Sequence, residues 1–143
     1  MLDPNRLFPI DEKARLVAKS LYDEVCDLPI ISPHGHCDPK WFAENQRFPD
    51  PSELFVIPDH YIFRMLVSQG YSLDQLDIDI NKKSGRKPRP QDVWKIFSNN
   101  YYLFRGTPSE MWLNYSFEKV FGISKPLNSE NSCLLYTSDA ADE

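Results

Sequence analysis

The sequence predicts an α/β protein that is mostly α-helical, with one clear strand near residues 29–32. A short apolar run, Pro29-Ile30-Ile31, is continuous rather than alternating, which is typical of a strand covered on both faces. Helical periodicity precedes this run and dominates the rest of the chain. Because one strand cannot form a sheet and needs partners for its edges and faces, the chain is expected to be part of a larger fold.

Residues 11–27 are predicted to form an amphipathic helix. Asp11 suits the N-cap, Glu12 favours the first turn, and Pro29 prevents easy continuation. The apolar residues repeat at i, i+3 and i+4, as expected for one helix face: Ala14, Val17, Ala18, Leu21 and Val25.

The predicted strand leads directly into His34-Gly35-His36. Two histidines at i and i+2 of an extended segment point to the same side, and two neutral imidazoles can hold one divalent metal ion. Such a position suits chemistry, because (β/α)8 barrels build active sites at the C-terminal ends of their strands. The alternative is that His34 and His36 only satisfy backbone groups of a loop.

Residues 39–58 are irregular, and their aromatic side chains are expected to pack a loop onto the core. A helix is predicted at 59–69, with Asp59 as N-cap and Gly70 as its C-terminal stop. One side of this helix is apolar (Ile62, Phe63, Leu66, Val67) and the other is polar (His60, Tyr61, Arg64, Ser68). The polar stripe combines a proton carrier, a phenol and an anion-binding group, although from its pattern alone an ordinary solvated face is favoured.

Residues 72–90 are polar and contain a basic run, which is interpreted as a solvated loop rather than a nucleic-acid patch. Residues 91–121 are aromatic-rich and helical, and their aromatic stripes are expected to form core. Thr107 and Glu110 form a capping box around Pro108, and Gly122 ends the helix.

The last residues, 133–143, are predicted to be sequencing-adapter read-through. Cys133 to Ser138 back-translate as TGT CTC TTA TAC ACA TCT, a transposase mosaic end, and the adapter continues in frame through Glu143. The alternative is a natural disordered acidic tail. The genuine polypeptide, residues 1–132, is then expected to stop by truncation.

Composition excludes several classes of protein. The tail holds three acidic residues and none of the 16 Lys and Arg, so the formal charge of −5 becomes −2 without it. Near-neutral charge argues against a general role at nucleic acids or membrane surfaces. Cys26 and Cys37 form no CxxC motif, which favours a reducing compartment, and the sequence contains no long apolar span or signal-peptide pattern.

Four phrases together resemble the N-terminal part of the uronate (glucuronate) isomerase family, within the amidohydrolase superfamily. They occur in the family's order and span nearly all of residues 5–125, and the match ends near Asn128. The phrases are RLFP at 6–9, LPIISPHGH at 28–36, PDHYIFRML at 58–66 and YLFRGTP at 102–108.

This resemblance implies a distorted (β/α)8 barrel, with strand 1 near 29–32 and a helical insertion at about 59–125. It also implies interconversion of D-glucuronate with D-fructuronate, and of D-galacturonate with D-tagaturonate, in cytoplasmic sugar-acid catabolism. A uronic acid would be the substrate, with no nucleic acid or membrane as partner. The sequence leaves the oligomeric state of the full-length protein open, with a homo-oligomer as one alternative.

The resemblance assigns His34 and His36 to a divalent metal ion, Zn²⁺, and Tyr61 to proton transfer or hydrogen bonding at the enediolate. His60 lies on the same helical stripe and is included as a catalytic candidate. Helix geometry adds Arg64, whose planar guanidinium suits the substrate carboxylate. A late-strand aspartate of the family lies outside this sequence, so the 143-residue chain is expected to be inactive.

Two alternatives stay open at this point. The first is another metal-dependent hydrolase or deaminase of the same superfamily, which the HxH motif fits equally well. The second is a non-catalytic helical binding module that docks through its basic loop.

Overall fold

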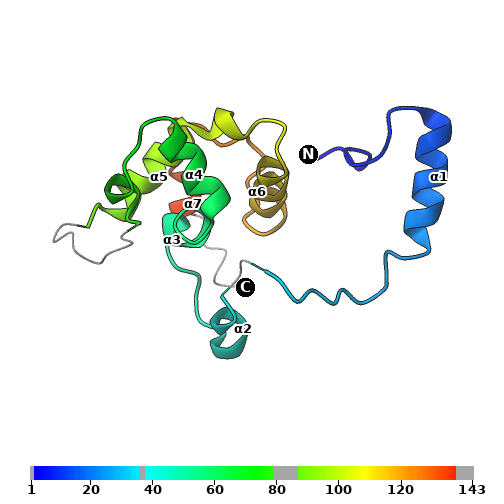
Figure 1. Ribbon diagram of the computed structural model, residues 1–143, viewed down its shortest axis with the longest axis horizontal. Coiled ribbons are helices and arrows are strands. Elements are labelled where there is room, and N and C mark those ends of the chain that lie inside the picture. The colour runs from blue at the N-terminus through cyan, green and yellow to red at the C-terminus, as the bar shows by residue number, and fades with distance from the viewer. Residues whose placement is uncertain (1, 36–37, 79–86, 138–143) are drawn as a thin grey trace. The chain divides into compact units, whose positions relative to one another are not determined.

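The computed structural model describes residues 2–35, 38–78 and 87–137, and the chain divides into two compact units, Met1–Gly35 and His36–Glu143 (Figure 1). The first unit contains α1 (Glu12–Asp23). The second contains α2 (Lys40–Glu44), α3 (Pro51–Phe55), α4 (His60–Ser68), η1 (Asp74–Leu76), α5 (Pro90–Asn99), η2 (Tyr101–Phe104), α6 (Pro108–Lys119) and α7 (Leu134–Thr137). Over the part of the chain that is described, no helix has the length and apolar content required to cross a membrane.

Helix α1 begins where the sequence predicts and ends one turn earlier. The Asp11 side chain accepts a hydrogen bond from the Ala14 N–H at 2.8 Å, so it caps the helix as expected. The helix ends at Asp23, and residues 24–27 continue as turns. Phe8 packs edge-on against Tyr22, with ring centroids 5.9 Å apart, and the Lys19 Nζ lies 5.6 Å from the centroid of the Phe8 ring.

The strand predicted at 29–32 is absent, and none of the described residues lies in a β-strand. Ile30 and Ile31 are 93% and 91% exposed in an irregular segment. A strand needs a neighbouring strand to receive its backbone hydrogen bonds, and the described residues offer none. The prediction of one clear strand is therefore wrong for this structure. The apolar residues Ile30 and Ile31, on which the prediction rested, are almost fully exposed.

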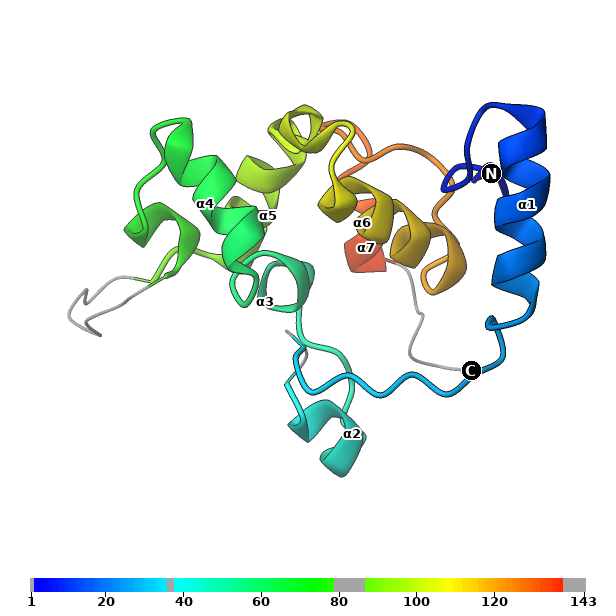
Figure 2. The same cartoon turned by 45° about the vertical axis from the view of Figure 1, so that its right-hand side comes forward.

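The second unit is built around an aromatic core. Helices α3, α4 and α5 lie side by side in both views (Figures 1 and 2), and Phe55 of α3 has its ring 6.3 Å from Trp94 of α5 and 5.4 Å from Phe117 of α6. Within residues 91–121, the aromatic side chains that are at most 5% exposed confirm that the predicted stripes form core: Trp94, Phe97, Tyr101, Phe104 and Phe117. Phe55, from the segment predicted to be irregular, joins the same core. Trp112 and Tyr115 are exceptions, because they are 50% and 47% exposed.

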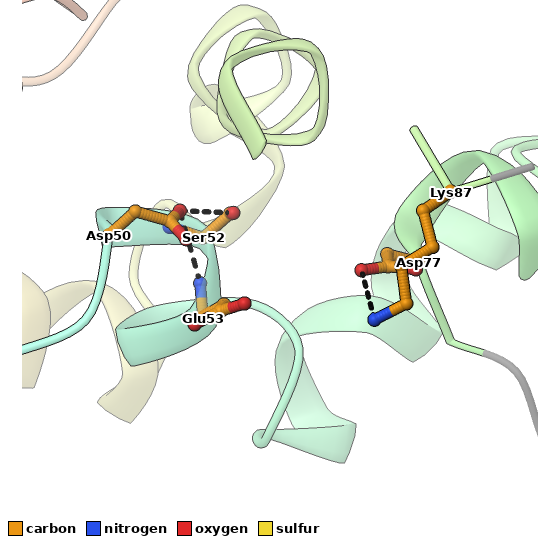
Figure 3. A network of polar contacts seen from close by, with 5 residues as sticks. All are labelled: Asp50, Ser52, Glu53, Asp77 and Lys87. Carbon is orange, nitrogen blue, oxygen red and sulfur yellow. Dashed lines mark hydrogen bonds and ion pairs between the residues drawn. The ribbon is translucent and has the colours of Figure 1, made fainter. Parts of the chain in front are cut away.

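Side-chain caps fix where several helices begin. Asp50 starts α3 by accepting hydrogen bonds from the Ser52 N–H at 2.8 Å and the Glu53 N–H at 3.4 Å. It also accepts from the Ser52 hydroxyl, as Figure 3 shows. Thr107 starts α6 by accepting from the Glu110 N–H at 3.2 Å, which confirms this half of the capping box. The Glu110 carboxylate returns to the Gly106 N–H at 2.7 Å rather than to Thr107 itself.

The segment after α6, residues 120–137, packs against the core. Gly122 has a positive φ of 66°, and the next N–H, of Ile123, reaches back to the Phe117 carbonyl at 2.8 Å. The Trp94 indole donates to the Ser132 carbonyl at 2.8 Å, and Leu127 and Leu135 are each 7% exposed. Leu135, which lies in the predicted adapter segment, therefore occupies a place in the core of this structure.

Candidate active site on helix α4

The first turn of α4 carries two of the residues that the sequence singles out. Asp59 caps the helix, and its side chain accepts from the Tyr61 N–H at 2.8 Å. The rings of His60 and Tyr61 lie against each other with centroids 4.4 Å apart and an interplanar angle of 33°. Tyr61 is 62% exposed, so it lies at the surface of this unit.

Burial separates the two faces of α4 nearly as predicted. Ile62 and Leu66 are fully buried and Phe63 is partly buried, whereas Val67 is 37% exposed and does not belong to the core. Tyr61, Arg64 and Ser68 are exposed and His60 is half-buried. The helix therefore presents an imidazole, a phenol and a guanidinium within two turns, and its apolar face holds them on the core.

The predicted metal pair is only partly described. His34 lies in the exposed segment after α1, where its carbonyl accepts from the Ser32 hydroxyl at 2.6 Å. His36 lies outside the described residues. His34 belongs to the first unit and the α4 residues to the second, so the structure describes the two parts of the predicted site separately.

The donor chemistry of His34 and His36 fits a divalent ion such as Zn²⁺, because imidazole nitrogen is a common zinc ligand. Within the described ranges, no group of three or more His, Cys, Asp or Glu side chains gathers in a way that could hold a metal. Two histidines supply half of a four-coordinate set, so further ligands are required.

The largest displacement of a pKa among the described residues belongs to Tyr101. Burial raises the pKa of this phenol well above its ordinary value of 10.0, and the negative charge of Glu110 raises it further. Its hydroxyl donates to the Asn114 Oδ1 at 2.9 Å and thereby ties η2 to α6. The sequence pattern predicts Tyr101 only as an aromatic core residue and gives no signal for this polar link.

The described residues at the end of the basic run, Lys87 and Arg89, form ion pairs with acidic side chains. Arg89 forms a two-pronged pair with Asp92, at 2.9 and 2.8 Å, and its side chain lowers the pKa of that carboxyl. Lys87 lies 3.9 Å from Asp77 (Figure 3). Lys82, Lys83 and Arg86 lie outside the described residues. The described end of the run is therefore paired with carboxylates, as an ordinary solvated loop would be.

Comparisons with known proteins place the chain in a family. The model of the family "Glucuronate isomerase" matches residues 10–141. This range extends into the segment 133–143, so the expectation that the match ends near Asn128 is wrong. The uronate isomerase of Phenylobacterium zucineum is 51% identical over 136 residues, which are 94% of this chain and 28% of that protein. The uronate isomerase of Caulobacter vibrioides is 51% identical over 128 residues, covering 90% of this chain and 26% of that protein.

Solved structures agree with this result. The chain superposes on the crystal structure of glucuronate isomerase from Caulobacter crescentus with a TM-score of 0.85 and 46% identity, covering 99% of this chain and 30% of that one. The uronate isomerase of Thermotoga maritima, at 24% identity, shares the fold with a TM-score of 0.74. The chain thus spans less than a third of the length of these relatives. A family match over residues 10–141 and close structural agreement over nearly the whole chain show that it belongs to the glucuronate isomerase family.

Proposed function

We propose that this chain is the N-terminal part of a uronate isomerase that interconverts D-glucuronate with D-fructuronate, and D-galacturonate with D-tagaturonate. The observation that supports this most directly is the contact between the rings of half-buried His60 and exposed Tyr61 at the capped start of α4, with Arg64 one turn further on. The family match favours isomerisation over the hydrolase and deaminase chemistry of the wider superfamily. It also disfavours a non-catalytic binding module.

Aldose–ketose isomerisation moves a proton between C2 and C1 through an enediolate, so it needs a group that carries the proton and donors for the negative oxygen. In this proposal the Tyr61 hydroxyl hydrogen-bonds or transfers a proton at the enediolate oxygen. His60, in contact with the Tyr61 ring, is the neighbouring proton carrier. Arg64 holds the substrate carboxylate, because a guanidinium binds carboxylates through two parallel N–H donors.

His34 and His36 would hold the metal ion, Zn²⁺, together with ligands from elsewhere in the longer protein. The ion, when bound, supplies a Lewis acid that polarises the substrate carbonyl or hydroxyl. The fold we propose for the longer protein is a (β/α)8 barrel, in which residues 29–32 become strand 1 and residues 59–125 form a helical insertion. The exposed, apolar Ile30 and Ile31 support this placement, because such a segment suits a strand covered on both faces. We place the enzyme in the cytoplasm, with homo-oligomerisation as part of the proposal.

The direct test is a chimera that joins residues 1–132 of this chain to the remainder of the Caulobacter vibrioides relative. We expect the chimera to convert D-glucuronate to D-fructuronate, and the 143-residue chain alone to show no turnover. Ester, amide and deaminase substrates serve as controls for the superfamily alternatives. A folded chimera that turns over one of these substrates and no uronate would refute the proposal.

A further inference from the structure

We propose that Asp59 is a positioning residue for the reaction, and that its side-chain cap holds Tyr61 in place for contact with substrate. This inference rests on the proposed function of Tyr61, but its own basis is the hydrogen bonding at the start of α4. The Asp59 carboxylate accepts from the backbone N–H of Tyr61 itself, at 2.8 Å. The cap therefore acts on the same residue that we assign to the chemistry.

The backbone carbonyl of Asp59 also forms hydrogen bonds with the first turn of α4. It accepts from the N–H groups of Ile62 and Phe63 at 3.0 and 3.1 Å. Ile62 is fully buried and Phe63 is partly buried, so the residues that follow Tyr61 are anchored in the core. Tyr61 thus lies between a capped N–H group and an anchored neighbour, which leaves its backbone little freedom to turn.

The side chain of Tyr61 extends from this fixed backbone toward the surface. It is 62% exposed, and the His60 ring at a centroid distance of 4.4 Å is the contact that the first turn provides. The position of the Tyr61 phenol follows from the position of its backbone, so a change at the cap would displace the reacting group. Small displacements of such groups are costly, because a shift of about 1 Å can lower a rate by about a hundredfold.

Substitutions of Asp59 in the chimera can separate the effect of its capping hydrogen bond from the effect of its negative charge. Asp59→Asn keeps a side-chain oxygen and is an equally good N-cap, whereas Asp59→Ala removes it. We expect kcat to stay within about twofold for Asp59→Asn and to fall by about tenfold or more for Asp59→Ala, with KM changed by less than about threefold. Asp59→Gly keeps the helix nearly as stable but lacks the oxygen, so it should lose kcat as Asp59→Ala does even if Asp59→Ala fails to fold.

Thr107→Ala is the matched control, because Thr107 caps α6 through the same kind of bond, to the Glu110 N–H at 3.2 Å. It should lower Tm by about as much as Asp59→Ala and leave kcat unchanged. The inference is overturned if Asp59→Asn is as damaging as Asp59→Ala, which would point to a role for the charge. It is also overturned if Asp59→Ala and Asp59→Gly leave kcat at the parent value.

Hydrogen exchange of the Tyr61 amide in the 143-residue chain gives a readout that does not depend on activity. Protection should be lost in Asp59→Gly and kept in Asp59→Asn, and unchanged protection in Asp59→Gly would contradict the positioning role. An unsubstituted chimera that folds but isomerises no uronate would instead refute the proposed function of the site. The two failures are therefore distinguishable.

Discussion

At the scale of single residues, the phenol of Tyr61 is the group on which the proposed chemistry depends most. Substituting Tyr61→Phe in the chimera removes one hydroxyl and keeps the ring that packs on His60. We expect kcat for D-glucuronate to fall by about 10²–10⁴-fold, the range typical for loss of a general acid or base. Tyr102→Phe is the matched control, because Tyr102 is also 62% exposed and lies outside the proposed site. Equal kcat values for the two variants would contradict the role of Tyr61.

The two histidines of the HxH motif make a separate prediction about metal content. Purified chimera should carry about one equivalent of divalent metal per chain, and His34→Ala or His36→Ala should lose most of it, since each removes an imidazole ligand. Elemental analysis after dialysis measures this directly. His60→Ala is the control, because His60 is assigned to proton transfer and its loss should leave metal content unchanged. Full metal content in His34→Ala would remove the basis of the metal assignment.

Burial of Tyr101 should make the free energy of unfolding depend on pH in the alkaline range. Its pKa is raised in the folded chain, so the folded state keeps the phenol neutral while the unfolded chain ionises it above about pH 10. The contribution is fully present below that pH and is lost as pH rises toward the folded pKa. We expect the free energy of unfolding of the 143-residue chain to fall less steeply from about pH 10 to about pH 12 in Tyr101→Phe than in the parent. A slope equal to that of the parent in Tyr101→Phe would contradict the prediction.

At the scale of the element, α4 connects the core to the proposed site. Ile62 is fully buried, so Ile62→Ala should lower the free energy of unfolding of the 143-residue chain by about 2–5 kcal/mol, through lost burial and the cavity left behind. Val67→Ala, at a position 37% exposed on the same helix, should change it by less than about 0.5 kcal/mol. Chemical denaturation at low protein concentration measures both. Similar values for the two variants would mean that α4 is not anchored as described.

Helices α4 and α6 were predictable from the sequence because local chemistry fixes their ends, whereas α2 and α3 lie in the segment 39–58 that was predicted to be irregular. Asp59, Thr107 and Gly122 mark helix boundaries through hydrogen bonds or backbone conformations that depend on a few neighbouring residues. The strand near Ile30 was not predictable in the same way, because a strand exists only when another segment pairs with it. Local apolar pattern cannot supply that partner.

The candidate site follows the same division. The polar stripe of α4 could be predicted because helical periodicity alone places Tyr61 and Arg64 on one face. The contact between the His60 and Tyr61 rings depends on side-chain conformation, and the link from Tyr101 to Asn114 depends on how η2 meets α6. Neither follows from spacing along the chain.

At the scale of the whole molecule, the chain spans less than a third of its relatives, and its last segment makes a prediction about the source DNA. Leu135 is 7% exposed in the core, next to a segment whose Ser132 carbonyl accepts from the Trp94 indole. If residues 133–143 are adapter read-through, this apolar position belongs to a natural residue that the adapter has replaced. A core position of this kind accepts an apolar side chain far more readily than a charged one, which would be buried without a partner.

We therefore expect a DNA read across the codon for Ser132 to continue in frame for about the remainder of a barrel, and to encode an apolar residue where Leu135 stands. The same read should supply the late-strand aspartate that the resemblance implies as a further metal ligand. If the DNA instead encodes Cys133 to Glu143 followed by a stop codon, the adapter interpretation is wrong. The family relationship would then describe ancestry, and a helical module without isomerase activity would become the better account of this chain.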